Sequence, residues 1–284
     1  MSENSKGKKK VVRAQSDPKQ PKVKSTEPAW KPTPEAKSQA NKLRIYAWVA
    51  WLAAIGVQLF AIFWILKQVP VNMVLLIGAI VVTGLLSVGG SMMWKKANRL
   101  DPASKEDGFR FWVQNQLGAI MAVVSFLPLI ILIFMNKDMD SKQKGMAGGV
   151  AIAVLAIVAA LGYSYDSPSQ EQYAAEQSII ETLTGKDEVY WTKSGKVFHV
   201  CDAVPDVNKE SKDGEIHVGT VAEAHAAGKS RLVSYWDREA LNYCGYTQDQ
   251  IDATKATVVA ATGDDRTDDS STEEDAADAT PPAS

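Results

Sequence analysis

Four residues in the last third of the chain are of types that bind transition metals: His199, Cys201, His217 and Cys244. Histidine nitrogens and cysteine thiolates are the usual zinc ligands, and a structural zinc site needs four ligands. His199 and Cys201 are two residues apart, so on a strand both side chains point to one face. His217 on the next predicted strand and Cys244 would complete the set. A metal-binding membrane sensor or enzyme is therefore one hypothesis for this chain.

The same residues allow simpler interpretations. His199 can pack or hydrogen-bond within a predicted hairpin, with the other three residues at the surface. Cys201 and Cys244, the two cysteines of the chain, can form one disulfide if their domain faces an oxidising compartment. No nucleophile elbow, phosphate loop or His-Glu-x-x-His motif occurs, so we predict no catalytic residues and lean against an enzyme.

Two stretches, Val189–Cys201 (VYWTKSGKVFHVC) and Ile216–Gly228 (IHVGTVAEAHAAG), resemble a small module found beside bacterial nuclease-like and membrane domains. That module reads roughly V-Y-x-T-x-x-G-x-x-Y-H, with a nearby cysteine, an E-A-x-x-x-G helix and a final C-x-x-C. Its histidine and cysteines look like a zinc site. The resemblance covers about 45 of the 284 residues.

The chain departs from the module at the metal-binding positions. His199 matches the motif histidine, but Cys201 follows it more closely than in the pattern. Ser230–Tyr235 stands where the final C-x-x-C is expected, and Cys244 lies about ten residues beyond that place. We therefore predict a degenerate module that keeps the fold and has lost the metal, with no cofactor; bound zinc is the alternative.

A small α+β soluble domain with a linking helix is predicted for residues 164–262. The linking helix opens at Ser167-Pro168, and Gly185 ends it. Hairpin and capping signals then predict four strands and three helices; Thr220 and Glu223 cap the first of these helices, Asp237 can cap the second, and Gly245 ends it. The strands are 188–192, 196–200, 215–219 and 230–235, and the helices are 220–228, 238–244 and 247–262.

Four long apolar segments lie before this domain, at 45–66, 71–94, 111–135 and 146–163. About 20 apolar residues cross the roughly 30 Å of hydrocarbon in a bilayer, so 45–163 is predicted to be a four-helix transmembrane domain. None of the four segments contains Asp, Glu, Lys or Arg. This argues against a proton relay, an ion pump or a charge-coordinating transporter. A transporter of a neutral or lipid-like solute remains an alternative.

The two ends of the chain differ in charge. Residues 1–44 carry 12 Lys or Arg against 4 acidic residues, and 264–284 carry 8 acidic residues against one arginine. We predict a disordered basic tail at 1–44 and a disordered acidic tail at 263–284. Topology and anionic lipid explain the basic charge, so nucleic acid is not an expected partner.

Lysine and arginine placement predicts the orientation in the cell membrane. With the N-terminus in the cytoplasm, the inner segments before the last span carry 17 basic residues and the outer loops carry 4. Four spans then return the C-terminal domain to the cytoplasm. Ser164–Thr184 has no Lys or Arg, so it gives this placement no independent support.

The predicted fold class is membrane α: four transmembrane helices, a small α+β C-terminal soluble domain and disordered termini. The leading functional hypothesis is a non-enzymatic accessory or scaffold subunit whose soluble domain binds a partner. Its expected partners are the lipid bilayer and other membrane proteins. The plan is also similar to uncharacterised four-span membrane proteins of actinobacteria, some of which are accessory subunits of assemblies such as respiratory supercomplexes.

Overall fold

The computed structural model describes residues 10–13, 30–209 and 213–262 of the chain. The chain divides into two compact units: residues 30–172, and the described parts of 1–29 together with those of 173–284. Each unit has a hydrophobic core of its own. The first unit is called the bundle below, and the second the C-terminal domain.

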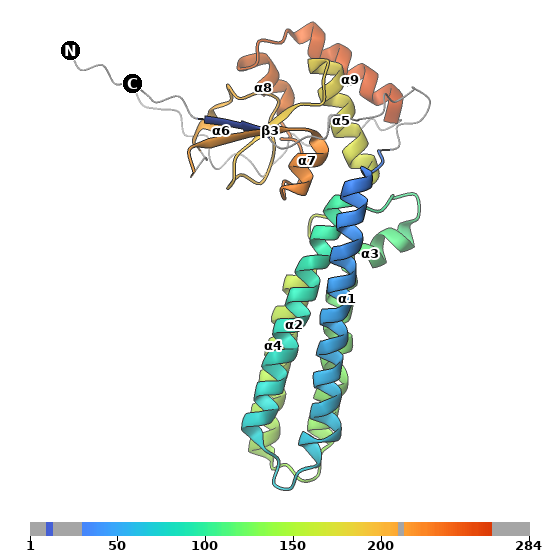
Figure 1. Cartoon of the computed structure of the whole chain (residues 1–284), viewed down its shortest axis with the longest axis vertical. Helices are drawn as coiled ribbons and strands as arrows, with labels where there is room; N and C mark the ends of the chain where they lie inside the picture. Colours follow the sequence, from blue (N-terminus) through green and yellow to red (C-terminus); the bar gives the residue numbers. More distant parts are fainter. Residues whose placement is uncertain (1–9, 14–29, 210–212, 263–284) are drawn as a thin grey trace, which may run out of the picture. The chain divides into compact units, whose positions relative to one another are not determined.

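Four long helices form the bundle, with a short 3-10 helix after the first (Figure 1). They are α1 (Pro34–Phe63), η1 (Ile65–Lys67), α2 (Met73–Leu100), α3 (Gly108–Met135) and α4 (Ser141–Gly162). Each of the four is long and apolar enough to cross a membrane. The prediction of a multi-spanning membrane protein is therefore confirmed.

Each long helix is preceded by a polar residue that caps it. The cap accepts a hydrogen bond from the backbone N–H three residues on, which satisfies one of the free donors in the first turn. The caps are Thr33, Asn72, Asp107 and Asp140. α1, α3 and α4 therefore begin before the apolar segments from which their spans were predicted, whereas α2 begins at Met73, inside the predicted segment 71–94.

The predicted disordered segment 1–44 needs correction in two places. Residues 34–44 form the first turns of α1, because Thr33 caps a helix whose first residue is a proline. Lys10–Arg13 forms a strand, β1. The remainder of 1–29 and the predicted acidic tail 263–284 lie outside the described residues.

The bundle core is apolar and closely packed. Its fully buried residues include Leu76 and Ile80 from α2 with Phe126 and Ile133 from α3. Near one end, α3 and α4 approach so closely that a Cβ on Gly162 would lie 2.7 Å from the backbone of Gly118. Glycine is therefore needed where these two helices meet.

Two pairs of small residues spaced four apart on bundle helices, Ser87 with Ser91 and Gly145 with Gly149, have different surroundings. Ser87 and Ser91 are buried, and Ser91 donates to the carbonyl oxygen of Ser87 at 2.9 Å. Gly145 and Gly149 instead have open space where a side chain would stand. The serine pair thus packs inside the bundle, whereas the glycine pair lies on its outer surface.

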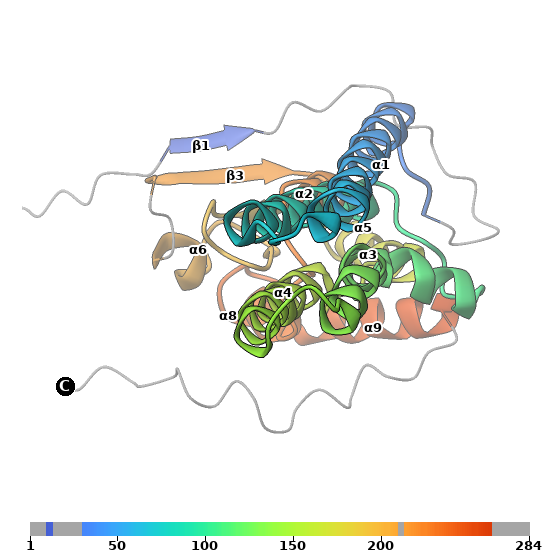
Figure 2. The ribbon, with the colours of Figure 1, turned by 90° about the horizontal axis from the view of Figure 1, so that it is seen from below.

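The C-terminal domain combines short helices with one small sheet (Figure 2). Its elements are α5 (Gln170–Thr184, whose first turn belongs to the bundle unit), β2 (Val189–Trp191), α6 (Pro205–Lys209), β3 (Glu215–Gly219), α7 (Val221–Ala226), α8 (Trp236–Asn242) and α9 (Gln248–Thr262). The core is formed by residues such as Ile180, Val189, Phe198 and Ile251. Gly185 and Gly245 have positive φ, as their predicted role as helix stops requires.

The sheet has the order β1-β3-β2. β3 pairs with β2 in antiparallel fashion and with β1 in parallel fashion, and Figure 2 shows β1 lying along β3. The predicted strand 215–219 is confirmed. Predicted strands 196–200 and 230–235 are reduced to isolated bridges, Tyr190 with His199 and Phe198 with Leu232.

Candidate functional site: buried ion pairs and a sheet edge in the C-terminal domain

The four predicted metal ligands have partners other than a metal. Cys201 and Cys244 are joined by a disulfide, with their Cα atoms 5.9 Å apart. His199 is buried, and its Nδ1 lies 2.9 Å from the carboxylate of Glu239. A disulfide sulfur is not a thiolate, so neither cysteine offers a metal ligand in this oxidised form. Zinc binding by the reduced set stays a prediction.

His217, the fourth predicted ligand, lies among carboxylates. Its Nε2 is 3.8 Å from Asp213, and its ring stacks on Trp191 with the centroids 6.1 Å apart. Asp213, Glu215 and His217 each offer a ligand atom, all within 4.8 Å of one another. Glu215 and His217 are alternate residues of β3 and share a face, and Asp213 lies in the turn just before that strand. Within the described residues, this is the group with a spacing suited to a divalent cation.

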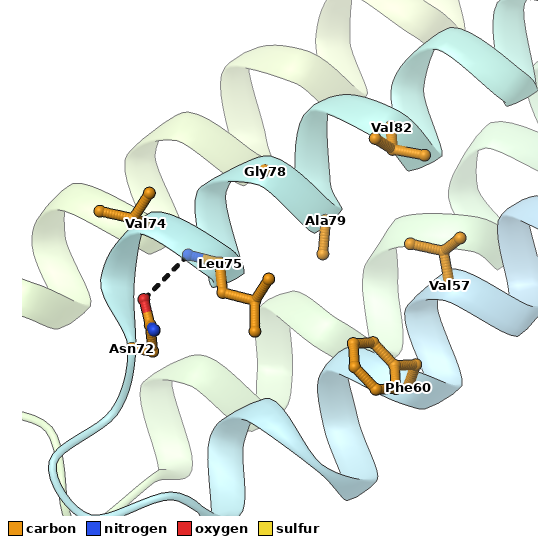
Figure 3. A pocket seen from close by; sticks show the side chains of 8 residues that line it. All are labelled: Val57, Phe60, Asn72, Val74, Leu75, Gly78, Ala79 and Val82. Carbon is orange, nitrogen blue, oxygen red and sulfur yellow. Dashed lines mark hydrogen bonds between the residues drawn. The ribbon is translucent and has the colours of Figure 1, made fainter.

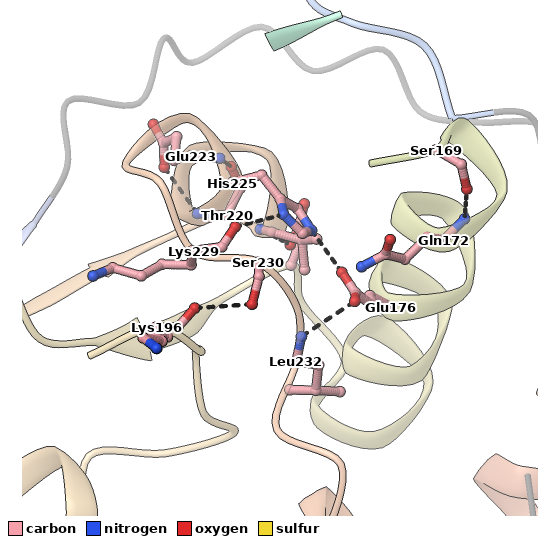
Figure 4. Close-up of polar contacts among 12 residues, drawn as sticks. Ser169, Gln172, Glu176, Lys196, Thr220, Glu223, His225, Lys229, Ser230 and Leu232 are labelled. Carbon is pink, nitrogen blue, oxygen red and sulfur yellow. Dashed lines mark hydrogen bonds and ion pairs between the residues drawn. The ribbon is translucent and has the colours of Figure 1, made fainter. Parts of the chain in front are cut away.

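A second buried histidine pair, which the sequence analysis overlooked, joins α5 to α7 (Figure 4). Nε2 of His225 lies 2.6 Å from the carboxylate of Glu176, and Nδ1 donates to the carbonyl oxygen of Lys229 at 3.0 Å. Glu176 also accepts from the N–H of Leu232 at 3.2 Å. The ring of His225 stacks on Tyr173 at 3.6 Å. The carboxylate of Glu176 and the imidazole of His225 thus join α5 to α7 and to the segment that follows α7.

A sequence signal for this pair existed. Tyr173, Ile180 and Leu183 mark the apolar face of the linking helix, and Glu176 lies three residues after Tyr173 on that same face. A carboxylate on a buried helix face needs a buried partner. The partner could not be named, because its position depends on how α7 packs.

Lys229 is buried and closes a turn. Its Nζ donates to the carbonyl oxygens of Thr192 and Gly195, both at 2.6 Å, and to that of Lys193 at 3.3 Å. A buried ammonium group costs free energy unless its donors are bonded, and these carbonyls satisfy it. The lysine therefore holds the predicted hairpin loop in place.

Asp187 lies at the start of α7 and accepts the backbone N–H of Val221 at 2.8 Å. Burial raises the pKa of Asp187 to about 6. The hydrogen bond from Val221 opposes this rise in pKa, and the charges of Glu181 and Glu223 add to it. The carboxyl group thus titrates close to neutral pH.

β2 pairs with one edge of β3, and β1, which is remote in the sequence, pairs with the other edge. The register pairs Lys10 with Glu215 and Val12 with His217. β1 precedes all four membrane helices in the chain, whereas β3 follows them. The sheet therefore combines a segment that precedes the membrane-spanning helices in the sequence with segments that follow them.

Uncharged side chains connect the bundle helices. Trp94 and Asn98 on α2 donate to the carbonyl oxygen of Gln114 at 2.7 and 2.8 Å. Gln116 donates to the carbonyl oxygen of Ser164 at 3.1 Å. Three buried hydroxyls have no hydrogen-bond partner among the described residues: Thr83, Ser87 and Ser125.

Basic side chains join several helix ends at one end of the bundle. Arg44 of α1 lies 2.6 Å from the carboxylate of Asp101, which follows α2. Lys95 of α2 donates to the carbonyl oxygens of Leu161 and Tyr163, at the end of α4, at 2.8 and 2.6 Å. The N-terminal half of α1 and the ends of α2 and α4 therefore meet, as a four-span topology requires.

An apolar groove of about 580 Å³ lies between α1 and α2 of the bundle (Figure 3). Phe60 lines it from α1, and Leu75, Gly78 and Val82 line it from α2. Asn72 at its end is occupied in capping α2. The groove offers contacts for hydrocarbon and no group that could carry out acid–base chemistry.

No family model, curated protein or solved structure matches the chain. No match supports the resemblance to the small zinc module or the resemblance to actinobacterial four-span proteins. Both resemblances stay predictions.

Proposed function

We propose that this protein is a non-enzymatic accessory or scaffold subunit of a larger membrane assembly, and that its C-terminal domain binds a protein partner. The bundle anchors the chain in the bilayer and packs beside other membrane proteins. The domain presents a folded surface to the partner.

The observation that supports this proposal best is the use made of the buried ionisable groups in the C-terminal domain. His199 is bound to Glu239, and His225 to Glu176, in contacts that join helices to strands and loops. Lys229 is bound to three carbonyl oxygens. Groups that catalysis would need at a pocket are here engaged in holding the fold together.

The proposed orientation places both termini in the cytoplasm. The support is the excess of basic residues in the segments that would be inside, 17 against 4. The pairing of β1 with β3 fits this arrangement, since strands of one sheet must lie on the same side of the membrane. The disulfide points the other way, because cytosolic thiols are normally kept reduced. In the cytoplasm, Cys201 and Cys244 would be a dithiol that oxidation closes.

Affinity purification from native membranes tests the proposed function. The tagged full chain should retain one or more membrane proteins in fixed ratio after detergent extraction. The same tag on an unrelated four-span protein is the control. A homogeneous particle with no co-purifying protein would contradict the accessory-subunit proposal.

A reporter fusion at Ser284 tests the orientation. Alkaline phosphatase fused there should be inactive, and a fluorescent protein should fluoresce. Trapping thiols in living cells with a permeant alkylating reagent should find Cys201 and Cys244 reduced. An active phosphatase with oxidised cysteines would place the domain outside the cytoplasm and overturn the topology.

A metal-binding sensor or enzyme is the second candidate, favoured by the group formed by Asp213, Glu215 and His217. His217 is shared with the originally predicted set of His199, Cys201 and Cys244. Metal analysis of the purified chain, with and without reductant, decides between the two. Zinc below one equivalent under both conditions, with unchanged stability of His217→Ala, would end this candidate. One equivalent lost in Cys244→Ser would favour the original set.

The third candidate is a transporter of a neutral or lipid-like solute, favoured by the apolar groove between α1 and α2. Its test is uptake of an uncharged lipid-like probe by reconstituted vesicles. Gly78→Leu fills the groove, and Gly89→Leu is the matched change on α2 outside it, since both glycines have open space around them. Equal uptake by the two variants would contradict a role for the groove.

A further inference from the structure

The strand that pairs with the β1-facing edge of β3 comes from a distant part of the sequence. β2 pairs with one edge of β3, and β1 pairs with the other. An unpaired strand edge exposes a row of backbone N–H and C=O groups that can accept another extended segment. The chain covers this edge with four residues that are separated from β3 by the entire membrane bundle.

The chemistry of β3 defines what fits beside it. Ile216 and Val218 are buried, 4% and 5% exposed, and Ile216 packs with Val207 of α6. Asp213 and Glu215 add negative charge at the start of the strand. An occupant that combines β-branched residues, which favour strands, with cationic residues complements this edge. Lys8–Arg13, with the sequence KKKVVR, has that composition.

The contact with β1 is suited to exchange. Four paired residues make a short strand, and a short strand pairing contributes little stability by itself. Residues 14–33 separate β1 from α1 in the sequence. A partner segment held nearby in an assembly can compete with so short a strand.

We propose that the β1-facing edge of β3 is a strand-docking site for an extended segment of a partner protein that combines lysine or arginine with β-branched residues. The chain's own Lys10–Arg13 fills the site when the partner is absent. The partner segment adds as a parallel strand in the place of β1. This inference rests on the proposed function, because it names the surface through which the C-terminal domain binds its partner.

A peptide with the sequence of residues 8–15, KKKVVRAQ, is the probe. Its binding is measured by fluorescence anisotropy with the full chain in detergent. Val12→Pro in the protein removes a backbone donor from β1 and should open the site. We expect this variant to bind the peptide at least about tenfold more tightly than the wild type, because the tethered competitor is lost. Gln20→Pro, which adds a proline outside Lys10–Arg13, should bind as the wild type does.

Amide hydrogen exchange keeps the test independent of misfolding. Amides of β3 that face β1 should lose protection in Val12→Pro and regain it when the peptide is added. The amides of α9 should not change. Equal peptide affinity of Val12→Pro and the wild type, or unchanged protection of β3, would overturn the proposal.

A charge exchange tests the recognition of basic residues. Glu215→Lys in the Val12→Pro background should weaken binding of KKKVVRAQ about two- to fivefold. A peptide with Glu at the position of Lys10, which the register pairs with residue 215, should recover that loss. Binding unaffected by either change would contradict the charge preference.

Two further measurements separate this proposal from the proposed function. If a partner co-purifies equally with the wild type and with Glu215→Lys, the docking site fails and the accessory role stands. If the peptide binds as expected but nothing co-purifies, the accessory role fails and the docking site stands. Dimers that form in the wild type and are lost in Val12→Pro would show a second copy as occupant and overturn the partner assignment.

Discussion

The bundle and the C-terminal domain bury polar groups in different ways. In the bundle, neutral donors such as Asn98 reach backbone carbonyl oxygens of the next helix. In the C-terminal domain, ionisable side chains are buried against each other, as Glu176 is against His225. A neutral donor left unpaired costs less than a buried charge left unpaired, so the two regions should respond differently to the loss of a partner. We therefore expect the loss of a polar contact to destabilise the C-terminal domain more than the bundle.

The largest effect is expected from His225→Ala. It leaves the Glu176 carboxylate buried without its imidazole and opens a cavity beside Tyr173. We expect a loss of about 3–5 kcal/mol in the free energy of unfolding of the C-terminal domain. Amide hydrogen exchange of α5 and α7 in the full chain, measured at increasing denaturant concentration, gives this free energy. A loss below about 1 kcal/mol would show that the buried pair contributes little.

The second largest loss of stability is expected in the bundle, from Gly162→Ala. Its new Cβ would lie 2.7 Å from the backbone of Gly118, so α3 and α4 must move apart. We expect a loss of about 1–3 kcal/mol. Gly149→Ala on the same helix is the matched control, because it meets no atom within 4 Å. Thermal unfolding in detergent measures both, and equal melting temperatures would contradict the close approach.

The buried carboxyl of Asp187 gives the C-terminal domain a dependence on pH. Its folded pKa, about 6, is above the ordinary value of 3.8, so ionisation is harder in the folded state. This penalty is absent below about pH 4 and grows as the pH rises through 6. Asp187→Asn keeps an acceptor for the N–H of Val221 and should stabilise the domain by roughly 1–3 kcal/mol at pH 7.5. Stability measured at pH 4 and pH 7.5 should show the gain at the higher pH alone.

The smallest effect is expected at the surface of the same domain. Lys255 lies 2.8 Å from Asp237, and both side chains are about 30% exposed. Partial burial opposes ionisation of Asp237, but the hydrogen bonds and charges of Lys255 and Arg238 outweigh it and lower the pKa of the carboxyl group. Lys255→Ala should cost less than about 1 kcal/mol. A cost similar to that of His225→Ala would remove the distinction between buried and exposed pairs.

Much of the helical structure was predictable because its causes are local. The four spans follow from apolar length, and the start of α7 follows from Thr220 and Glu223, which form the capping box that was expected. Asp237 shows the limit of such rules, since it was expected to cap α8 but pairs with Lys255 instead. A side chain that can cap a helix can also bind a cation, and the packing of α9 decides between them.

The candidate site was less predictable because its contacts are distant in sequence. His199 and Cys201 are two residues apart, but their partners Glu239 and Cys244 come from a later part of the domain. β1 was assigned to a disordered tail, since Lys10–Arg13 has no strand neighbour within the N-terminal region. Pairing with β3 supplies the hydrogen bonds that its own neighbourhood cannot.

The amino-acid sequence alone determined the membrane character, the number of spans and the positions of most helices, because hydrophobic length and end caps act over a few residues. The tertiary structure decided which groups face each other: the disulfide, the two buried histidine–glutamate pairs and the strand that joins the two ends of the chain in one sheet. Those contacts depend on the packing of segments up to hundreds of residues apart, which no local pattern records.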